Sequence, residues 1–516
     1  ACTADPAAQE RLDTAIRAYY KGAGQGGSDE FYSAVLTALN GSKAAYLVGD
    51  IEIGAHSSVW PGAVLRADHG TMTIATHDVV IRYLRFRPGN GGNGDDSHDA
   101  VTIYGEGVHD IVVDGERIER ITDSHDHGDA TVIDATGKFV YPGFIDMHVH
   151  ALLHPWTEKG DISPRFDREL MLKMFRLLLE HGVTTIRDPG SETEAAVTLR
   201  RMLEEGDVIG PRLLTAGRIL NASSFTPEPF ITVTTPEDVK REIQWQKKAG
   251  VDFIKVYASM PLDLVKVAID EAHRLDLPVI GHLQRTTWTE ASKLGIDAIS
   301  HGAPWSAEYL PAEKRDRYQQ SLFGRVDWLD NIDLQSQVFR EMTDALVKSG
   351  VAVDPTLIAM HTKFLGDDKR WLENPDNKLM PELIAGWRAG AFTRDWKPEQ
   401  YAAAKAAWPK MLALTKLLFD RGVLLTVGTD TPTPWIVPGA SFHSELELLS
   451  DAGIPNAHVL QMATRNAAIA LRRDDIGLIR PGAYADLVIL TLDPVADIRN
   501  TRSIETVIVR GKRLGH

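Results

Sequence analysis

Two histidines separated by one residue close a short apolar segment, YPGFIDMHVH, at residues 141–150. A Pro-Gly turn leads into this segment, and its pattern predicts a strand that ends at His148 and His150. Side chains at positions i and i+2 of a strand point to the same face, so both imidazoles can bind one ion. The spacing therefore predicts a metal site at the end of this strand.

Other polar residues stand where further apolar stretches end. They are Lys255 in DFIKVYAS, His282 in VIGHLQ, His301 in IDAISHG and Asp430 in LLTVGTDTP. Any one of them, taken alone, is more often a structural residue than a ligand. Six such residues at the ends of five strands predict one shared site, because catalytic groups of a parallel barrel gather at the carboxyl ends of its strands.

The elements that must position these residues alternate between apolar strands and helical stretches, which is typical of a parallel α/β fold. Eight strands are expected, at residues 139–147, 183–187, 212–218, 251–257, 277–282, 296–301, 350–357 and 422–429. Eight such units predict a (β/α)₈ TIM-type barrel over residues 141–474.

Two inserts interrupt this rhythm, at about 303–340 and 362–410. The second contains four tryptophans, which are Trp371, Trp387, Trp396 and Trp408. Long insertions often cover an active site, and we expect this insert to lie over the barrel mouth. The alternative is a set of surface helices with a buried tryptophan face.

The two flanks of the barrel are strand-rich. Residues 101–140 and 475–516 predict one small β-sandwich built from both chain ends, with a hairpin at Asp114-Gly115. Residues 1–100 predict an N-terminal helical and β-rich α/β extension without catalysis of its own.

Composition excludes some classes of protein. The net charge of −15 argues against a nucleic-acid binder. The sequence has no run of 18 apolar residues, so no transmembrane helix is expected. The single cysteine, Cys2, excludes an intrachain disulfide and a zinc site built from several thiolates.

The opening ACTADPAAQE predicts a chain from which a leader was removed, and hence a periplasmic or secreted protein. Cys2 is a candidate lipid anchor, the alternative being an incidental cysteine. We also expect a homo-oligomer.

The motifs together resemble the amidohydrolase superfamily, in particular its imidazolonepropionase-like and Xaa-Pro dipeptidase-like branch. The resemblance spans roughly residues 101–516 and rests on PGFIDMHVH, GVTTIRDPG, DFIKVYAS, the HLQ and SHG histidines, GTDTP and the tail motifs ATRNAAIAL, IGLIRPGAYADLVIL and VIVRGK. It implies a metal-dependent hydrolase with two divalent ions.

The resemblance also implies a role for each ligand. His148 and His150 would bind the more buried ion, and His282 and His301 the outer one. Lys255 would be carbamylated and bridge both ions, and Asp430 would contact the first ion and the attacking water.

Physical chemistry agrees with these roles. A protonated lysine beside two dications would be repelled, whereas its carbamate is a bridging anion. Two ions about 3.5–4 Å apart can hold a bridging hydroxide and polarise a carbonyl. Asp430 is suited to pass the proton of the water to the leaving amine. Histidine and carboxylate ligands favour zinc.

Substrate contacts are expected from three residues. Tyr257 and Arg285 could bind a substrate carboxylate, or could serve packing and a surface ion pair. His443, on the loop after the last strand, could touch substrate or cap the following helix. Many relatives carry a second histidine two residues after the one at 282, where this chain has Gln284.

The expected activity is cleavage of an amide bond, peptide-like or N-acyl amino-acid, in a small-molecule substrate. An ester, lactone or phosphotriester hydrolase with the same centre is an alternative, and a mononuclear deaminase-like enzyme is another. A non-catalytic binding protein would have no use for the ligand set.

Overall fold

The computed structural model describes residues 79–84, 110–122, 131–152, 154–160, 162–163, 166–223 and 229–515. The chain divides into two compact units, one of residues 1–139 with 480–482 and one of residues 140–479 with 483–516. Most of the predicted N-terminal extension, and Cys2 with it, lies outside the described residues. Among the described helices, none has the length and apolar character needed to cross a membrane.

The first unit contains a set of paired strands. They are β1 (Val79–Leu84), β2 (Asp110–Asp114), β3 (Arg117–Thr122) and the greater part of β4 (Thr131–Pro142). β1 pairs antiparallel with β2 and parallel with β4. β2 and β3 form an antiparallel hairpin, whose turn contains Gly115 at φ 58°. The predicted hairpin at Asp114-Gly115 is therefore confirmed.

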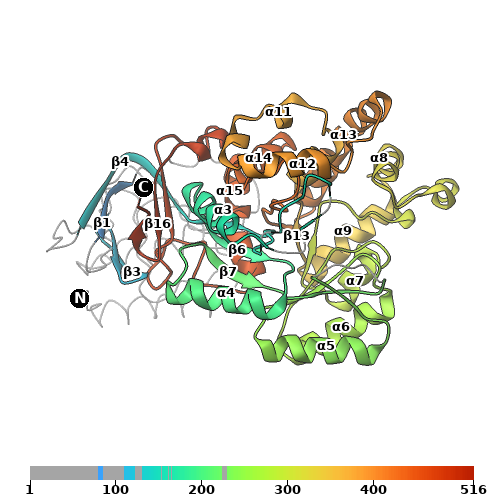
Figure 1. Cartoon of the computed structure of the whole chain (residues 1–516), viewed down its shortest axis with the longest axis horizontal. Helices are drawn as coiled ribbons and strands as arrows, with labels where there is room; N and C mark the ends of the chain where they lie inside the picture. Colours follow the sequence, from blue (N-terminus) through green and yellow to red (C-terminus); the bar gives the residue numbers. More distant parts are fainter. Residues whose placement is uncertain are drawn as a thin grey trace, which may run out of the picture. The chain divides into compact units, whose positions relative to one another are not determined.

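The second unit is an α/β structure with two runs of parallel strands (Figure 1). The first run has the order β5-β6-β7 and the second the order β9-β8-β10-β11-β12-β13-β14. The strands are β5 (Phe144–Asp146), β6 (Val183–Asp188), β7 (Arg212–Thr215), β8 (Ile219–Asn221), β9 (Phe230–Thr232), β10 (Ile254–Val256), β11 (Val279–Gly281), β12 (Ala298–Ser300), β13 (Ala352–Asp354) and β14 (Leu424–Leu425). Strands β15 (Leu487–Leu490), β16 (Ile504–Val509) and β17 (Lys512–Arg513) pair antiparallel near the C-terminus.

Helices connect the parallel strands or follow the last of them. They are α3 (Arg168–Glu180), α4 (Thr193–Glu205), α5 (Pro236–Ala249), α6 (Leu262–Arg274), α7 (Trp288–Leu294), α9 (Gln337–Ser349), α13 (Pro398–Asp420), α14 (Ala440–Asp451), α15 (Asn456–Met462) and α16 (Arg465–Ala470). Local signals set their ends. α5, for example, begins with a capping box between Thr235 and Asp238 and ends at Gly250, whose φ is 100°.

The core beneath the candidate site follows from strand geometry. A buried apolar cluster contains Phe253, Ile280, Ala298 and Ala352, together with Leu214 and Ala216. The first four lie two residues before Lys255, His282, Ser300 and Asp354. Residues two apart share one face of a strand, so each apolar side chain lies one layer below a polar one. The packed layer thereby fixes where the polar side chains emerge.

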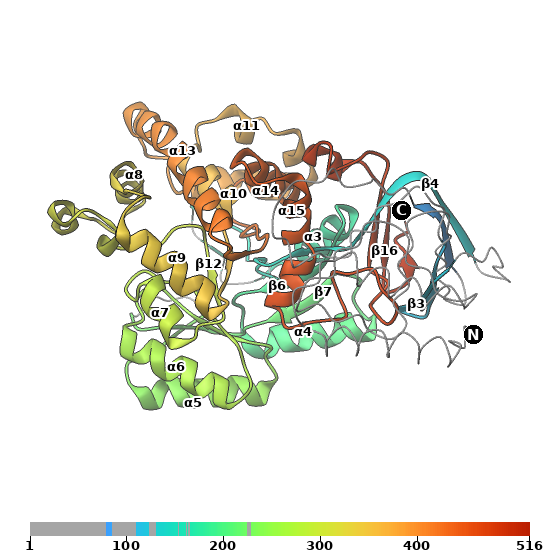
Figure 2. The ribbon, with the colours of Figure 1, turned by 180° about the vertical axis from the view of Figure 1, so that it is seen from behind.

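The two inserts contain short helices. The first holds the 3₁₀ helices η1 (Ala307–Tyr309) and η2 (Ala312–Arg317) and helix α8 (Leu322–Asn331). The second runs from the end of α10 (Leu357–Phe364) through α11 (Lys369–Leu372), η3 (Pro375–Leu379), η4 (Pro381–Leu383) and α12 (Ile384–Gly390) into α13. α8 lies beside α13 in both views (Figures 1 and 2).

The four tryptophans of the second insert face inward to different degrees. Trp371, Trp387 and Trp408 are buried, and Trp396 is half-buried. The first residues of the insert lie at the carboxyl side of the strands, where Lys363 contacts Asp430.

Candidate metal centre

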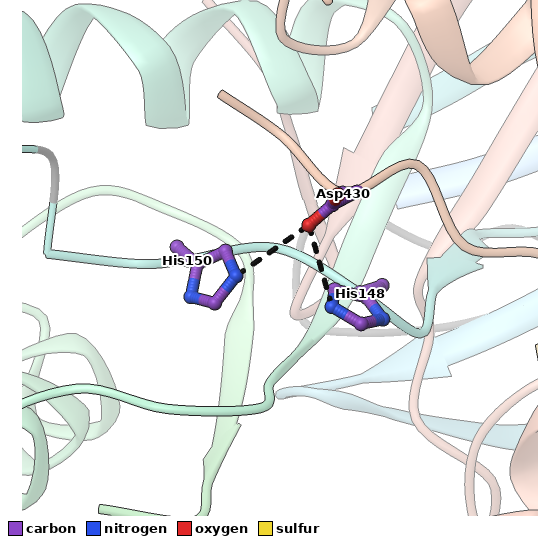
Figure 3. A group of neighbouring side chains, drawn as sticks. All are labelled: His148, His150 and Asp430. Atoms are coloured by element: carbon purple, nitrogen blue, oxygen red, sulfur yellow. Dashed lines mark ion pairs between the residues drawn. The ribbon is translucent and has the colours of Figure 1, made fainter. Parts of the chain in front are cut away.

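Three side chains converge where β5 and β14 lead into their following loops (Figure 3). Asp430 Oδ1 lies 3.5 Å from His148 Nε2 and 3.6 Å from His150 Nε2. The Asp430 N–H donates to the His148 carbonyl and the His150 N–H to the Thr431 carbonyl, each at 2.8 Å. These backbone bonds hold the two segments in parallel, so the three side chains meet at one point.

The two imidazoles are held in orientation by contacts at their Nδ1 atoms. His148 Nδ1 lies 2.9 Å from Asp354 Oδ2, and His150 Nδ1 lies 3.1 Å from the Gly190 carbonyl oxygen. Both partners are acceptors, so they favour a proton on Nδ1 and leave Nε2 with a lone pair. Tetrahedral zinc ligands lie roughly 3.3–3.6 Å apart when each bond is about 2.0–2.2 Å long. The observed spacing of Asp430 from both Nε2 atoms fits this geometry.

Two residues of the site have a backbone that is unusual outside glycine. His301 has φ 72° and Asp430 has φ 67°, both in the left-handed region. This conformation costs free energy for residues with a Cβ, and such positions cluster at functional sites. The fold therefore maintains strain at the point where these side chains turn inward.

A second pair of histidines adjoins the first. The rings of His282 and His301 are 4.3 Å apart, and the His301 ring is 4.9 Å from that of His148. Thr356 Oγ1 lies 2.7 Å from His301 Nδ1 and so orients it. Gln284, which stands in place of a second histidine, has its Nε2 3.4 Å from His282 Nε2. Four histidines and Asp430 thus form one continuous set.

Lys255 lies beneath this set and is almost fully buried. Its Nζ donates to Ser300 Oγ at 2.9 Å. Burial lowers the pKa of Lys255 to about 7, against the opposing charge of Asp354. The side chain can therefore exist as a neutral amine, which is the nucleophilic form of lysine.

The protonation states of the polar residues suit metal binding. Burial lowers the pKa of His148, and it lowers the pKa values of His282 and His301 well below their usual range. Burial opposes ionisation of Asp430, but the Lys363 cation and the His150 contact hold its pKa well below its usual value. His150 is the exception: burial acts to lower its pKa, but its interactions with Asp430 outweigh this and raise it, so an ion would have to displace a proton there. A metal ion needs neutral imidazoles and an ionised carboxylate.

The three residues expected to contact substrate lie in different surroundings. The Tyr257 ring is 4.5 Å from that of His282. Arg285 is exposed, and its guanidinium makes no hydrogen bond or ion pair within the described residues. Tyr257 therefore adjoins the histidines, and Arg285 is available to a ligand.

His443 has a different place from the one expected. It lies inside helix α14, not on a loop, and it is fully buried. Its Nδ1 is 2.9 Å from Thr501 Oγ1, and its ring is 5.8 Å from that of His181 and 6.2 Å from that of Phe144. The described contacts of His443 are with these residues and Phe442, and not with the metal ligands.

Two charged residues of the site were absent from the sequence expectations. Asp354, at the end of β13, accepts from Arg187 at 2.5 Å and also faces His148. Lys363 Nζ lies 3.3 Å from Asp430 Oδ2. Asp354 carries the signal used for the others, a polar residue at the end of an apolar strand. Lys363 lies within α10, and its local sequence gives no such signal.

A family comparison assigns the chain to a class of enzyme. Residues 139–514 match the model of the amidohydrolase family, to which this chain belongs. The predicted class of hydrolase acting on carbon–nitrogen bonds is thereby confirmed.

Individual relatives resemble the chain over different lengths. Imidazolonepropionase of Streptomyces coelicolor is 34% identical over 387 residues, covering 74% of this chain and 84% of its own length. Adenine deaminase of Serratia proteamaculans is 37% identical over 105 residues, covering 20% of this chain. The chain spans only 17% of that deaminase, and 13% of a similar dihydroorotase of Streptococcus thermophilus.

Solved structures share the fold. A prolidase complexed with N-methylphosphonate-L-proline has a TM-score of 0.61 at 22% identity, covering 85% of this chain and 99% of its own. A Xaa-Pro dipeptidase with bound methionine in its active site has a TM-score of 0.59 at 20% identity, covering 85% and 100%. Bottromycin amidohydrolase has a TM-score of 0.60 at 22% identity, covering 86% of both chains.

Proposed function

We propose that this chain is a binuclear metal-dependent hydrolase that cleaves an amide bond, peptide-like or N-acyl amino-acid. The observation that carries the proposal is the meeting of His148, His150 and Asp430 beside a second pair of histidines. Family membership supports the same class of chemistry. The structural neighbours include proteins named prolidase, dipeptidase and amidohydrolase, which supports an amide substrate.

The group of His148, His150 and Asp430 fits one divalent ion, and we assign a second ion to the adjoining histidines. His148, His150 and Asp430 would hold one ion, His282 and His301 the other, and carbamylated Lys255 would bridge them. Zinc is the metal we propose, because nitrogen and oxygen donors at an open site favour it. When bound, such ions activate water and polarise the carbonyl under attack.

Asp430 is the proposed proton carrier. Its Oδ1 faces the two histidine Nε2 atoms, while its Oδ2 faces Lys363 Nζ. This arrangement keeps the carboxylate ionised and fixed in orientation. Asp430 would accept the proton of the attacking water and return it to the leaving amine.

A closed (β/α)₈ barrel is the architecture that we propose for the site. Backbone bonds support closure at both places where the two runs of strands approach one another. The Asp252 N–H donates to the Thr215 carbonyl at 2.9 Å, and the Met147 N–H donates to the Val427 carbonyl at 2.8 Å. The small β-sandwich from both chain ends remains part of the proposal.

A mononuclear deaminase-like enzyme is the second candidate. The compact group of three ligands suffices for one ion, and the chain has local similarity to adenine deaminase. The two candidates differ in metal content and in the product that they release.

The test combines metal analysis with a substrate panel. Protein produced with zinc should contain close to two ions per chain and should hydrolyse members of a panel of dipeptides and N-acyl amino acids. His150→Ala should lose metal and turnover. His273→Ala, on α6 with a half-exposed ring, is the matched control and should lose neither. One ion per chain with ammonia release from aminopurines would support the deaminase instead, and metal-free protein without turnover would overturn both.

A further inference from the structure

Arg325 is a partly buried cation without a carboxylate partner among the described residues. It lies on α8 in the first insert, with its guanidinium carbon 5.4 Å from the centre of the Trp305 ring. Within the described residues, the guanidinium has neither a hydrogen bond nor a carboxylate at ion-pair distance. Burial lowers the pKa of Arg325, opposed by Tyr318 and Tyr257. Arginine nonetheless stays charged in proteins.

Other enclosed arginines of this chain are neutralised. Arg187 donates to Asp354, and Arg218 pairs with Glu242 at 2.7 Å. Such pairing is the rule, because an enclosed charge without a counter-ion carries a desolvation cost that nothing offsets. Arg325 departs from this rule, so its counter-ion is to be sought outside the described chain.

The position of Arg325 links it to the metal centre. Trp305, beneath it, follows His301 by four residues, and its ring is 6.3 Å from that of Phe364. Phe364 adjoins Lys363, which contacts Asp430. A short series of neighbours, Trp305, Phe364 and Lys363, therefore connects Arg325 to Asp430.

Electrostatics connects the same groups. Arg325 lies close enough to His282 and Tyr257 for its charge to act on both side chains. The field of the cation thus extends over the proposed substrate side of the centre.

We propose that Arg325 binds a carboxylate of the substrate and thereby selects amides that carry one. The proposal rests on the amide hydrolase function given above. A carboxylate matches the planar donor fork of arginine and can accept two parallel hydrogen bonds. Lys363 is already engaged by Asp430, whereas the Arg325 guanidinium has no carboxylate partner among the described residues.

The experiment compares charged and neutral versions of one substrate. N-acetyl-leucine, N-acetyl-phenylalanine and N-acetyl-proline are each paired with the N-acetyl amino alcohol, in which CH₂OH replaces the carboxylate. Acetate release gives kcat/KM for each member of a pair. The zinc-loaded wild type should prefer the acid, and Arg325→Gln should lose about 10- to 100-fold of that preference with little change for the alcohol.

The control is Arg317→Gln, the same substitution at an exposed residue of the same insert, and it should keep the wild-type preference. Arg325→Lys should recover only part of the preference, because an ammonium cannot bind a carboxylate through a planar fork. Thermal unfolding checks that each variant is folded.

The outcomes separate the two proposals. An acid preference that is equal in wild type and Arg325→Gln overturns the role of Arg325 and leaves amide hydrolysis intact. Loss of the preference in Arg285→Gln instead would transfer the role to Arg285. No amide turnover by the wild type contradicts the proposed function. Calorimetry with the N-acetyl amino acids then tests the role of Arg325 in carboxylate binding. Weaker binding to Arg325→Gln than to the wild type supports that role, and equal binding overturns it.

Discussion

Asp354→Asn should lower both the stability of the protein and its affinity for metal. The two effects can be measured separately. One Asp354 oxygen faces His148 Nδ1 at 2.9 Å, and the other accepts from Arg187 at 2.5 Å. Both Asp354 and Arg187 are at most 2% exposed. Asparagine offers one acceptor oxygen and one NH₂ group, so it can satisfy only one of two donors.

The structure sets the size of each effect. Loss of one partner of a buried ion pair costs about 3–5 kcal/mol, because the other charge is left uncompensated. Loss of the carboxylate behind a metal-binding imidazole weakens metal affinity by about 10- to 100-fold. We therefore expect Asp354→Asn to lower the free energy of unfolding by about 3–5 kcal/mol and to weaken zinc binding within that range.

Arg187→Met provides the matched control. It removes the same ion pair but leaves the Asp354–His148 contact in place, so it should be destabilised while losing less metal affinity. The double variant Asp354→Asn/Arg187→Met has no uncompensated charge and should regain part of the stability. Its zinc affinity should stay low, because His148 still lacks its carboxylate.

The assay measures the two quantities on separate samples. Urea unfolding of metal-free protein, followed by tryptophan fluorescence, gives the stability without the contribution of bound metal. Competition with a chelator gives the zinc affinity. Wild-type zinc affinity in Asp354→Asn would refute the reasoning that this carboxylate orients His148. A double variant less stable than both single variants would refute the account of the ion pair.

Three further predictions address other parts of the chain. Lys255→Ala should lose the second ion and most turnover, and short carboxylic acids should restore some activity; full activity without them would contradict a bridging role. Burial raises the pKa of Glu445 to about 8 from 4.5, against two backbone N–H groups that lower it. The folded state then holds the extra proton, so stability should fall by up to about 1.4 kcal/mol per pH unit between these values. Glu445→Gln should lack that slope in urea titrations at pH 5 to 8, and equal slopes would contradict the assignment. A Cβ at Gly386 would lie 1.8 Å from the Trp156 carbonyl oxygen, so Gly386→Ala should cost about 1–3 kcal/mol in thermal or urea unfolding; wild-type stability would contradict this packing of α12.

The fold was largely predictable because the strands are local features. Each of the eight expected strand ranges coincides with a strand. Seven of these strands are shorter than expected, since pairing begins and ends inside the apolar run, and β6 (Val183–Asp188) extends one residue beyond its expected end. The short strands β8 and β9 were not expected. β9 (Phe230–Thr232) is partly exposed and carries no apolar run that would distinguish it from a loop.

The site was predictable where its signal is local. His148 and His150 share a strand face by their spacing, and the structure brings Asp430 to them. The contact between Lys363 and Asp430 joins residues 67 positions apart and depends on how α10 packs, which no local pattern reports. The sequence predicts a loop at His443 after the last strand, whereas Gly439 precedes a helix that contains His443 and continues to Asp451.

The hydrogen bonds that join the ends of β5 and β14 also determine when, during translation, the first metal site can be completed. Asp146 and Thr429, which bond across this junction, are 283 residues apart in the chain. At about 5–20 residues per second, translation takes roughly 15–60 s to pass from one to the other. During that interval the nascent chain displays two histidines without their aspartate. Stable metal capture must then wait until the last strand has been made, and a chain truncated before it would have no complete ligand set for the first ion.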